Sequence, residues 1–534
     1  LRESLTAVTD SLQKTFPSLA HPEWIALRLL EGDRSVIQLV ASGEIGQVSN
    51  DHAATATHAA EEKTSRADGA PVVATAEHLR WKLPPNYQDR LTEAIYAESG
   101  RIVARAVARQ GSSRRLDFQK KLDALLTGPW TGFPIMGLAF AGVIWLTIVG
   151  TNYPSSLLNK WLVGDLYPVL HDFSHAHLWP WLAGLLVDGM YLSTVWVISV
   201  MLPPMAIFFP IFTMLEDFGY LPRVAFNLDR LFRGVGAHGK QSLTMAMGYG
   251  CNAAGVIAAR IIDSPRERLI AIITNNFALC NGRWPTQILI ATIFLGALVP
   301  AQAAGFVATG AVFLVALLGF ALTLLSSWLL SRTVLKVEAS TFSLELPPYR
   351  PPNILRTLYT SLIDRTLFVL WRAMVFAMPA GAVIWLVANV SINNQSLAEW
   401  LIHGLDPVAV FFGLNGVILL AYVIAIPANE IVIPTILMLT VLVTGHVAPG
   451  SGNGVLFETD VESVKTLLTH AGWTTLTAVN LMLFSLCHNP CSTTLYTIYK
   501  ETHSAKWTAL SALLPLGIGF TLCALVTLGW HLLA

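Results

Sequence analysis

The sequence is poor in charge and in cysteine, and each shortage excludes a class of protein. Asp, Glu, Lys and Arg make up 13% of its 534 residues, about half the share found in soluble domains. The 34 basic residues only balance the 34 acidic ones, so nothing indicates nucleic acid as a partner. Five cysteines are too few for a disulfide scaffold, and all lie beyond residue 250 in or beside apolar segments, which suits free thiols.

Long apolar runs are what the chain has in place of charge. Hydrophobic residues make up 54% of it, and its mean hydropathy is +0.55. A helix needs about 20 mainly apolar residues to cross a bilayer, so we predict an all-α polytopic membrane protein in a lipid bilayer. The apolar segments are 132–150, 181–215, 242–260, 269–296, 306–331, 367–390, 408–443, 473–499 and 507–531.

Residues 1–125, before these segments, predict a small helical cytosolic domain with a linker. Residues 22–33 predict a short helix that ends at Gly32, and residues 87–109 predict another. The segment 41–79 is rich in Ala, Thr, Ser and Gly and has little apolar periodicity, so we expect it to be mobile or loosely helical.

The distribution of Lys and Arg predicts the orientation in the membrane. Basic residues gather in 101–121, 223–240, 260–268, 332–366 and 500–506, whereas the loops 151–180, 391–407 and 444–472 hold only Lys160 and Lys465. Because cytoplasmic loops carry the basic excess, we expect a cytoplasmic N-terminus and a C-terminus outside. That path requires 242–260 to be a partial crossing and 408–443 to break near Pro427. Prolines 203, 204 and 210 predict a further break in 181–215.

Polar residues interrupt several apolar segments, and such interruptions at membrane depth are tolerated where they line a cavity. The first, residues 248–255, places Cys251 and Asn252 between glycines. Small residues also suit close helix packing, with Cys251 as a buried apolar thiol. Asn252 beside the thiol favours a pathway.

The second interruption, residues 274–285, contains Asn275, Asn276, Cys280 and Asn281. Intramembrane polar groups are costly and often functional, but a hinge in the middle of the membrane explains this pattern equally well.

The third interruption surrounds Pro490, which removes a backbone donor and breaks the helix. Cys487, His488, Asn489 and Cys491 lie around it, and thiols and imidazoles are ligands for soft or borderline divalent ions. The Cys-x3-Cys spacing is not typical of structural zinc, so we interpret these residues as a pathway lining. Cys491 leads into a helix with basic residues at its end, as Cys251 does, which indicates a loose internal repeat.

Carboxylates occur in two apolar contexts. Glu430, next to Asn429, is surrounded by apolar residues and favours a place in the pathway. Glu216 and Asp217 are candidate ligands at a cytoplasmic exit, although capping of the helix that follows is the simpler interpretation.

One predicted external loop is rich in histidine. His171, His175 and His177 lie there with Asp165 and Asp172, and such groups can collect a divalent ion. Most loops of this kind are simply solvated.

Taken in order, several stretches resemble the Feo-type ferrous iron transport protein B family, the GTPase-coupled iron permeases of bacteria. Residues 24–33 are similar to the helical domain that joins this family's G domain to its membrane part. The other matching stretches are 215–226 (LEDFGYLPRVAF), 229–231, 239–242 (GKQS), 248–252 (GYGCN), 266–269 (RERL), 280–285 (CNGRWP), 490–491 and 500–502.

The resemblance implies two gate-like membrane halves with broken helices, which we place at 126–335 and 367–534, joined by a cytoplasmic connection at 336–366. It implies Fe²⁺ as the transported ion across the bacterial cytoplasmic membrane, with Cys251, Cys280 and Cys491 as candidate contacts. It also implies a small Feo accessory protein as a partner, and it is compatible with a homo-oligomer.

The G domain of the family, which would bring GTP and Mg²⁺, is not in this sequence. Residues 234–241 look like a phosphate-binding loop, but Gln241 stands where Ser or Thr is required and no apolar strand precedes it. No Asn-Lys-x-Asp motif occurs. Because the chain opens abruptly at Leu1, we expect a G domain upstream and no enzymatic activity from the chain itself.

Ferrous iron transport is therefore the leading hypothesis, and two alternatives stay open. In one, the cargo is another divalent metal, such as manganese or zinc, or a nucleoside-like solute. In the other, the chain is a membrane redox or signalling module whose cysteines cycle between thiol and disulfide.

Overall fold

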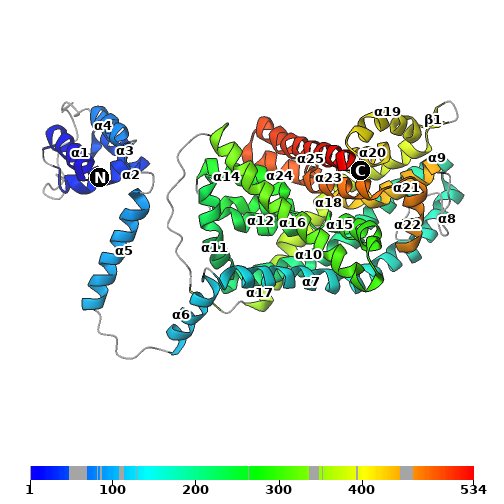
Figure 1. The fold of residues 1–534 in the computed structure, drawn as a ribbon, viewed down its shortest axis with the longest axis horizontal. Helices are drawn as coiled ribbons and strands as arrows, with labels where there is room; N and C mark the ends of the chain where they lie inside the picture. The colour runs from blue at the N-terminus through cyan, green and yellow to red at the C-terminus, as the bar shows by residue number, and fades with distance from the viewer. Residues whose placement is uncertain are drawn as a thin grey trace. The chain divides into compact units, whose positions relative to one another are not determined.

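The computed structural model describes residues 2–17, 19–46, 69–80, 82–83, 87–106, 114–128, 130–237, 239–262, 264–335, 348–350, 353–392, 395–444 and 461–533. Apart from a hairpin of β1 (Ser391–Ile392) and β2 (Gln395–Ser396), every element in these ranges is a helix (Figure 1). The elements form two compact units, one of α1–α5 and one of α6–α25. The all-α prediction is confirmed.

The first unit is made of short helices. They are α1 (Arg2–Thr15), α2 (Pro22–Glu31), α3 (Arg34–Ala41), η1 (Glu44–Gly46), α4 (Ala70–Arg80) and α5 (Tyr87–Ala106). The predicted end of α2 is confirmed, because Gly32 takes a left-handed φ of 82°. The Asp33 carboxylate then accepts the N–H groups of Ser35 and Val36 and starts α3.

α4 lies in the segment that the sequence predicted to be loosely helical, and for these residues the prediction is wrong. Val72 and Ala76 are fully buried in one core with Leu12 and Leu29 from α1 and α2. Burial of this apolar face stabilises a helix that has little propensity signal of its own. Residues 47–68 of the same segment lie outside the described residues.

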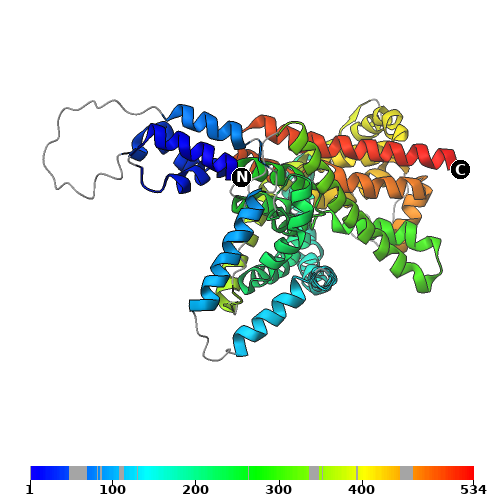
Figure 2. The ribbon, with the colours of Figure 1, turned by 60° about the vertical axis from the view of Figure 1, so that its left-hand side comes forward.

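Long apolar helices form the second unit. Five helical runs of described residues are long and apolar enough to cross a membrane, or six if one bent pair is counted as a span. The runs are Gly132–His177, Pro180–Phe218, Gln302–Arg332, Ile354–Asn389 and Ala505–Leu532, and the bent pair is Leu397–Phe411 with Gly416–Ile424. The last run, drawn in red, lies beside the orange helices that precede it (Figure 2). The chain is a multi-pass membrane protein.

Several of these runs contain more than one helix. They are built from α7 (Gly132–Asn159), η2 (Lys160–Leu166) and α8 (Tyr167–His177); from α9 (Pro180–Ala183), η3 (Gly184–Tyr191) and α10 (Leu192–Phe218); from α16 (Ala301–Arg332); from α17 (Ile354–Thr360), η8 (Ser361–Leu367) and α18 (Phe368–Asn389); and from α25 (Ala505–Leu533). Shorter helices include α6 (Arg114–Leu126), α11 (Tyr220–Gly234) and α22 (Val461–His470). α8, α9 and α19 lie at one end of this unit and α11, α14 and α17 at the other (Figure 1).

Two predicted loops and one predicted break are wrong. Helix continues from α7 through η2 and α8 where a loop was expected at 151–180, and α19 occupies most of the expected loop 391–407. α10 is unbroken although it contains Pro203, Pro204 and Pro210. All three prolines are buried against neighbouring helices, and such packing lets a membrane helix tolerate the missing N–H groups.

The helices η3 and α18 pack so closely that both need glycine at the contact. A methyl group on Gly381 would collide with the carbonyl of Gly189 and the side chain of Ser193. A methyl group on Gly184 would collide with the ring of Trp385. Small residues of this kind permit close packing between membrane helices.

Gly381→Ala should destabilise the membrane unit by roughly 1–3 kcal/mol, because an added methyl group in a filled contact forces a backbone shift. The measurement is the melting temperature of the purified protein in detergent. Gly517→Ala on α25 is the matched control, because nothing lies within 4 Å of its added methyl group and alanine is the better helix former. Equal melting temperatures for the two variants would contradict this contact.

The polar interruptions break their helices as predicted. The broken pairs are α12 (Gln241–Gly250) with α13 (Asn252–Ala258); α14 (Pro265–Thr274) and η5 (Asn275–Phe277) with α15 (Trp284–Ile290); α20 (Gly416–Ile424) with η9 (Asn429–Ile431) and α21 (Val432–Thr444); and α23 (Thr475–Cys487) with α24 (Ser492–Thr502). The sequence missed a further bend of 111° between α19 (Leu397–Phe411) and α20. Gly413, at φ 63°, lies in this bend.

The break at Cys251 and the break at Ala428 have nearly the same backbone geometry. Their φ and ψ angles are −154° and 124° at Cys251 and −150° and 118° at Ala428, and an asparagine follows each. Cys491, the expected counterpart of Cys251, has a φ of −62°. The second half therefore carries alanine at the position where the first half carries its thiol.

Candidate ion pathway at the broken helices

The four broken helices meet around one cavity. Three of its lining residues are the thiols Cys251, Cys280 and Cys491, each from a different break, and Glu430 supplies a carboxylate from the fourth. The other polar residues of the lining are Asn252, Asn281, Asn429, Thr493 and Thr494, and the thioethers of Met201 and Met205 complete it from α10. Met201 and Thr494, which are 293 positions apart in the sequence (494 − 201), thus line the same cavity.

The cavity is small. Its volume of about 20 Å³ exceeds the roughly 10–15 Å³ that one water needs. On this measure the cavity has room for about one water, or for one ion in contact with the lining groups.

The three thiols do not form a closed metal cage. Asn429 Nδ2 lies 3.9 Å from Cys280 Sγ, and Cys491 Sγ lies 3.2 Å from Thr494 Oγ1. All three cysteines are free. Among the described residues, no cavity cysteine belongs to a group of three His, Cys, Asp or Glu ligand atoms within 4.8 Å of one another. Such an open arrangement permits brief contacts between the thiols and an ion. Conduction requires several weak binding sites of this kind.

Glu430 approaches the backbone of the second interruption. Its carboxylate packs against Gly282 so closely that any side chain at that position would collide with it. Its own carbonyl accepts a hydrogen bond from Trp196 Nε1 at 3.2 Å. Gly282 therefore makes room for Glu430, which is the one carboxylate that the described residues contribute to the cavity lining.

Arg283 ties two of the breaks together and was not among the residues that the sequence singled out. Its side chain is 1% exposed. Nη1 donates to the carbonyls of Asn276 (2.7 Å) and Leu486 (2.9 Å), and Nη2 donates to Asn276 Oδ1 (2.9 Å) and the carbonyl of His488 (3.1 Å). An arginine inside an apolar segment is itself a functional signal, and that signal was present at residue 283.

Asn275 and Asn276 support the breaks and do not line the cavity. Asn275 Nδ2 donates to the carbonyl of Asn252 at 2.9 Å, and its amide fills the space that side chains at Gly248 and Gly255 would need. Asn276 Nδ2 donates to the carbonyl of His488 at 2.8 Å. These two residues therefore bind the backbone at the breaks.

At the third interruption, Cys491 lines the cavity, whereas Cys487, His488 and Asn489 do not. Cys487 is fully buried against Gly519 of α25. His488 Nε2 lies 3.0 Å from Asn429 Oδ1, so it orients a lining residue. Asn489 Nδ2 donates to the carbonyl of Pro490.

Glu216 and Asp217 lie at the exposed end of α10 and do not line the cavity. Asp217 Oδ2 accepts a hydrogen bond from Thr357 Oγ1 at 2.8 Å. α11 begins after Gly219, which has no side chain to cap it, so capping by Glu216 and Asp217 stays a prediction.

The predicted histidine loop is helical. His171 and His175 lie on α8 and approach Asp188 of η3, which the sequence did not single out. His177 Nδ1 lies 2.9 Å from the carbonyl of Phe173 instead, and His177 is outside this group.

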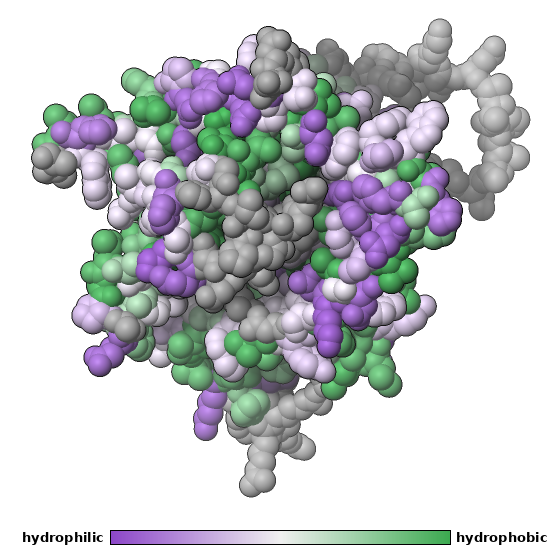
Figure 3. All heavy atoms as spheres, turned by 90° about the vertical axis from the view of Figure 1, so that its right-hand side faces the viewer, coloured by the Kyte–Doolittle hydropathy of each residue, from purple (hydrophilic) through white to green (hydrophobic). Residues whose placement is uncertain are grey.

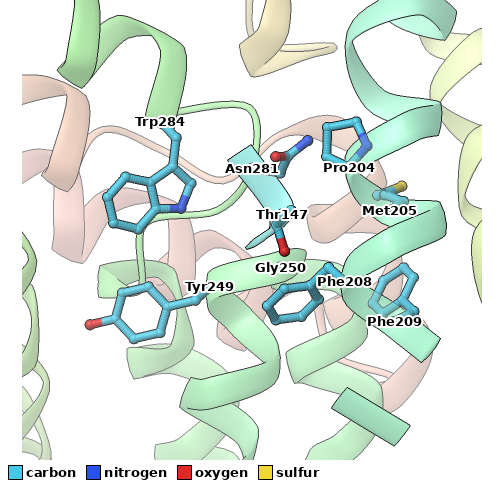
Figure 4. Close-up of a pocket in the computed structure, with 9 residues that line it drawn as sticks. All are labelled: Thr147, Pro204, Met205, Phe208, Phe209, Tyr249, Gly250, Asn281 and Trp284. Carbon is cyan, nitrogen blue, oxygen red and sulfur yellow. The ribbon is translucent and has the colours of Figure 1, made fainter. Parts of the chain in front are cut away.

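A second, more apolar cavity adjoins the first. Met205, Gly250 and Asn281 line both, and Figure 4 shows Asn281 between Trp284 and Pro204, above the rings of Tyr249 and Phe208. The buried Asn281 Nδ2 has no hydrogen-bond partner among the described residues.

Comparisons with known proteins point to one family. Residues 198–295 and 354–505 match the Gate family, described as nucleoside recognition, and residues 312–364 match the ferrous iron transport protein B C terminus. The chain is 29% identical over 419 residues to the Fe(2+) transporter FeoB of Staphylococcus aureus (strain MSSA476), covering 76% of this chain and 58% of that protein. It is 27% identical to the Fe(2+) transporter FeoB of Synechocystis (74% and 60% covered).

A third relative is a Fe(2+) transport protein A/Fe(2+) transporter FeoB fusion protein from Porphyromonas gingivalis, 25% identical over 76% of this chain and 51% of that protein. The chain thus spans between half and three fifths of the length of these relatives. No solved structure matches.

Proposed function

Because this chain belongs to the ferrous iron transport protein B family and corresponds to its membrane part, we propose that it carries Fe²⁺ across a bacterial membrane. The observation that supports this most is the single cavity in which the thiols of Cys251, Cys280 and Cys491 meet the carboxylate of Glu430.

The chemistry of the lining suits Fe²⁺. Thiolate and thioether ligands favour late divalent metals over Mg²⁺ and Ca²⁺, which prefer oxygen alone. In the proposed passage, Fe²⁺ exchanges water for sulfur, amide and carboxylate groups in turn. Because the ligands do not close around it, the ion is released as readily as it is bound.

Cys251→Ser, Cys280→Ser and Cys491→Ser should each lower Fe²⁺ uptake by about tenfold or more, the usual effect of weakening a metal ligand set. The measurement is radioactive iron uptake by cells that express the full-length protein, with its amount in the membrane determined in parallel. Cys523→Ser is the matched control, because Cys523 lies outside the cavity lining and its thiol donates to the carbonyl of Asn480. Uptake that is unchanged in all three cavity variants would contradict the proposed role of the thiols.

The two alternatives are less well supported. A different cargo would show itself in competition uptake, where manganese or zinc would displace iron at equal concentration. A thiol redox module would show disulfides among the cavity cysteines on oxidation and no metal flux, whereas all five cysteines are free here. The names of the relatives favour iron.

We also propose that the remaining parts of a longer protein regulate this chain. GTP and Mg²⁺ would bind a G domain outside these 534 residues, and a small Feo accessory protein is a candidate partner, as the fused relative suggests. We also propose a division of the chain into a cytosolic domain at 1–125, gate-like halves at 126–335 and 367–534, and a connection at 336–366. In this proposal the N-terminus is cytoplasmic and the C-terminus is outside. A GTPase assay of this chain beside the longer protein tests the proposal that GTP binds outside these 534 residues.

A further inference from the structure

A second group of ligands lies in the hairpin of α8 and η3, outside the cavity. The ligand atoms of His171, His175 and Asp188 all lie within 4.8 Å of one another. His171 Nε2 is 4.0 Å from Asp188 Oδ1, and His175 Nε2 is 3.7 Å from Asp188 Oδ2. We infer that these three side chains form a second binding site for a divalent transition-metal ion.

The fold brings the three residues together in two steps. His171 and His175 are four residues apart on α8, so they share one face of that helix, and their ring centroids are 4.3 Å apart. The chain then turns back at 178–180, and η3 places Asp188 opposite them. η3 is a π-helical segment, a departure from α-helix that is frequent at functional sites.

Asp188 is the main evidence for this site, because burial of its charged carboxylate costs free energy. It is 6% exposed, and the hydroxyl of Tyr167 donates to its Oδ1 at 2.8 Å. Its neighbour Gly189 packs against Gly381 of α18, which fixes the carboxylate toward α8. A buried carboxylate that faces two imidazoles is stabilised when a cation lies between them.

The donor set and its geometry fit a late divalent metal. Two histidines and one carboxylate with open positions are the ligand set of many non-haem Fe(II) sites. Metal–ligand bonds of about 2.1 Å place neighbouring donors roughly 3.3 Å apart, so the two histidine–carboxylate distances of 4.0 and 3.7 Å need to shorten by roughly 0.7 and 0.4 Å. Three protein ligands leave positions for water, so the ion can exchange.

The side chains that contact the three ligands are also compatible with a metal site. If His171 binds through Nε2, its Nδ1 faces Asp172 Oδ1 at 3.5 Å, and Tyr167 orients Asp188. Carboxylate and hydroxyl partners of this kind commonly orient metal ligands. His177 and Asp165 do not belong to the group.

The site lies where the hairpin reaches a membrane surface. Trp179 and Trp181, at the tip, are 73% and 54% exposed, as in the aromatic belts at bilayer interfaces. Figure 3 looks onto this end of the molecule, where hydrophilic residues lie among hydrophobic ones. Asp188 is 13 positions before Met201 of the cavity on one helical run, a separation of about 20 Å. Resting on the proposed function, we place the site as a first binding station for the ion before the cavity.

Co²⁺ binding to the purified protein in detergent tests the site without transport. The background variant carries serine at Cys251, Cys280 and Cys491, so that thiolate bands of the cavity are absent. We expect this protein to bind one Co²⁺ with the visible absorption of a nitrogen and oxygen site. His171→Ala/His175→Ala should abolish that binding, Asp188→Asn should weaken it at least tenfold, and His177→Ala, on the same helix, should leave it unchanged.

The competing interpretation is a clasp of hydrogen bonds that holds α8 to η3 without metal. It predicts identical Co²⁺ titrations for the background protein and for His171→Ala/His175→Ala, and that result would overturn the inference. Asp188→Asn keeps the volume of the side chain and a hydrogen-bond partner for Tyr167, so it decides the question if the double variant is not folded. Iron uptake plays no part in the readout, so this test can fail while the cavity thiols prove essential, and the reverse.

Discussion

Replacing Arg283 with methionine should destabilise the membrane unit more than any other single substitution at the breaks. The guanidinium donates to five oxygens, four of them backbone carbonyls from two breaks. Each buried acceptor left without a partner costs about 1–3 kcal/mol, so we expect a loss on the order of 3–5 kcal/mol. The measurement is the melting temperature in detergent, which should fall by roughly 10 °C.

Two further variants make this result specific. Arg283→Lys keeps the charge but lacks the planar fork that reaches both breaks at once, and it should recover only part of the stability. Arg260→Met removes an exposed arginine that pairs with Glu501 at 2.6 Å, and surface pairs of this kind contribute about 0–1 kcal/mol. If Arg283→Met melted at the temperature of Arg260→Met, the two breaks would be held together by something other than this side chain.

Replacing Glu430 with glutamine should lower Fe²⁺ uptake by tenfold or more while the protein stays folded. Glutamine keeps the volume beside Gly282, and the hydrogen bond from Trp196 goes to the backbone carbonyl of residue 430. Among the described residues of the cavity lining, the change removes the one carboxylate. An ion in this cavity needs a nearby negative charge, because in a low-dielectric site an uncompensated charge is very costly.

The measurement is concentration-dependent iron uptake by cells that express equal amounts of each variant. Glu462→Gln serves as the control, because Glu462 is exposed on α22 and pairs only with Lys465 in the described part of the chain. Normal uptake by Glu430→Gln would mean that thiols and amides alone compensate the charge of the ion. A loss of folded protein would mean that the carboxylate is structural.

Much of the candidate site was visible in the sequence, for a local reason. Cys251, Pro427 and Pro490 stand in apolar runs next to residues that break helices, and the structure breaks at all three places. A proline or a polar group in hydrocarbon disrupts the helix at its own position, so its effect can be predicted without knowledge of the neighbouring helices.

Other features depended on residues far away in the chain. Three prolines in α10 did not break it, because neighbouring helices bury them. Arg283 was part of a recognised motif, but its role became apparent only when the carbonyls of Leu486 and His488 were found around it. Asp188, a carboxylate in an otherwise apolar segment, carried the same kind of signal, but its role became apparent only when α8 folded back onto it.

The order of apolar and polar residues along the chain was by itself enough to determine an all-α membrane protein and the four helix breaks that carry polar motifs, because hydrophobic burial and backbone hydrogen bonding act on each segment separately. Only the tertiary structure decided which of the polar residues share a cavity, which ones brace it, and which histidines meet a carboxylate. Those outcomes are contacts between segments tens to hundreds of residues apart, and they depend on how closely the helices pack, which no single stretch of sequence specifies.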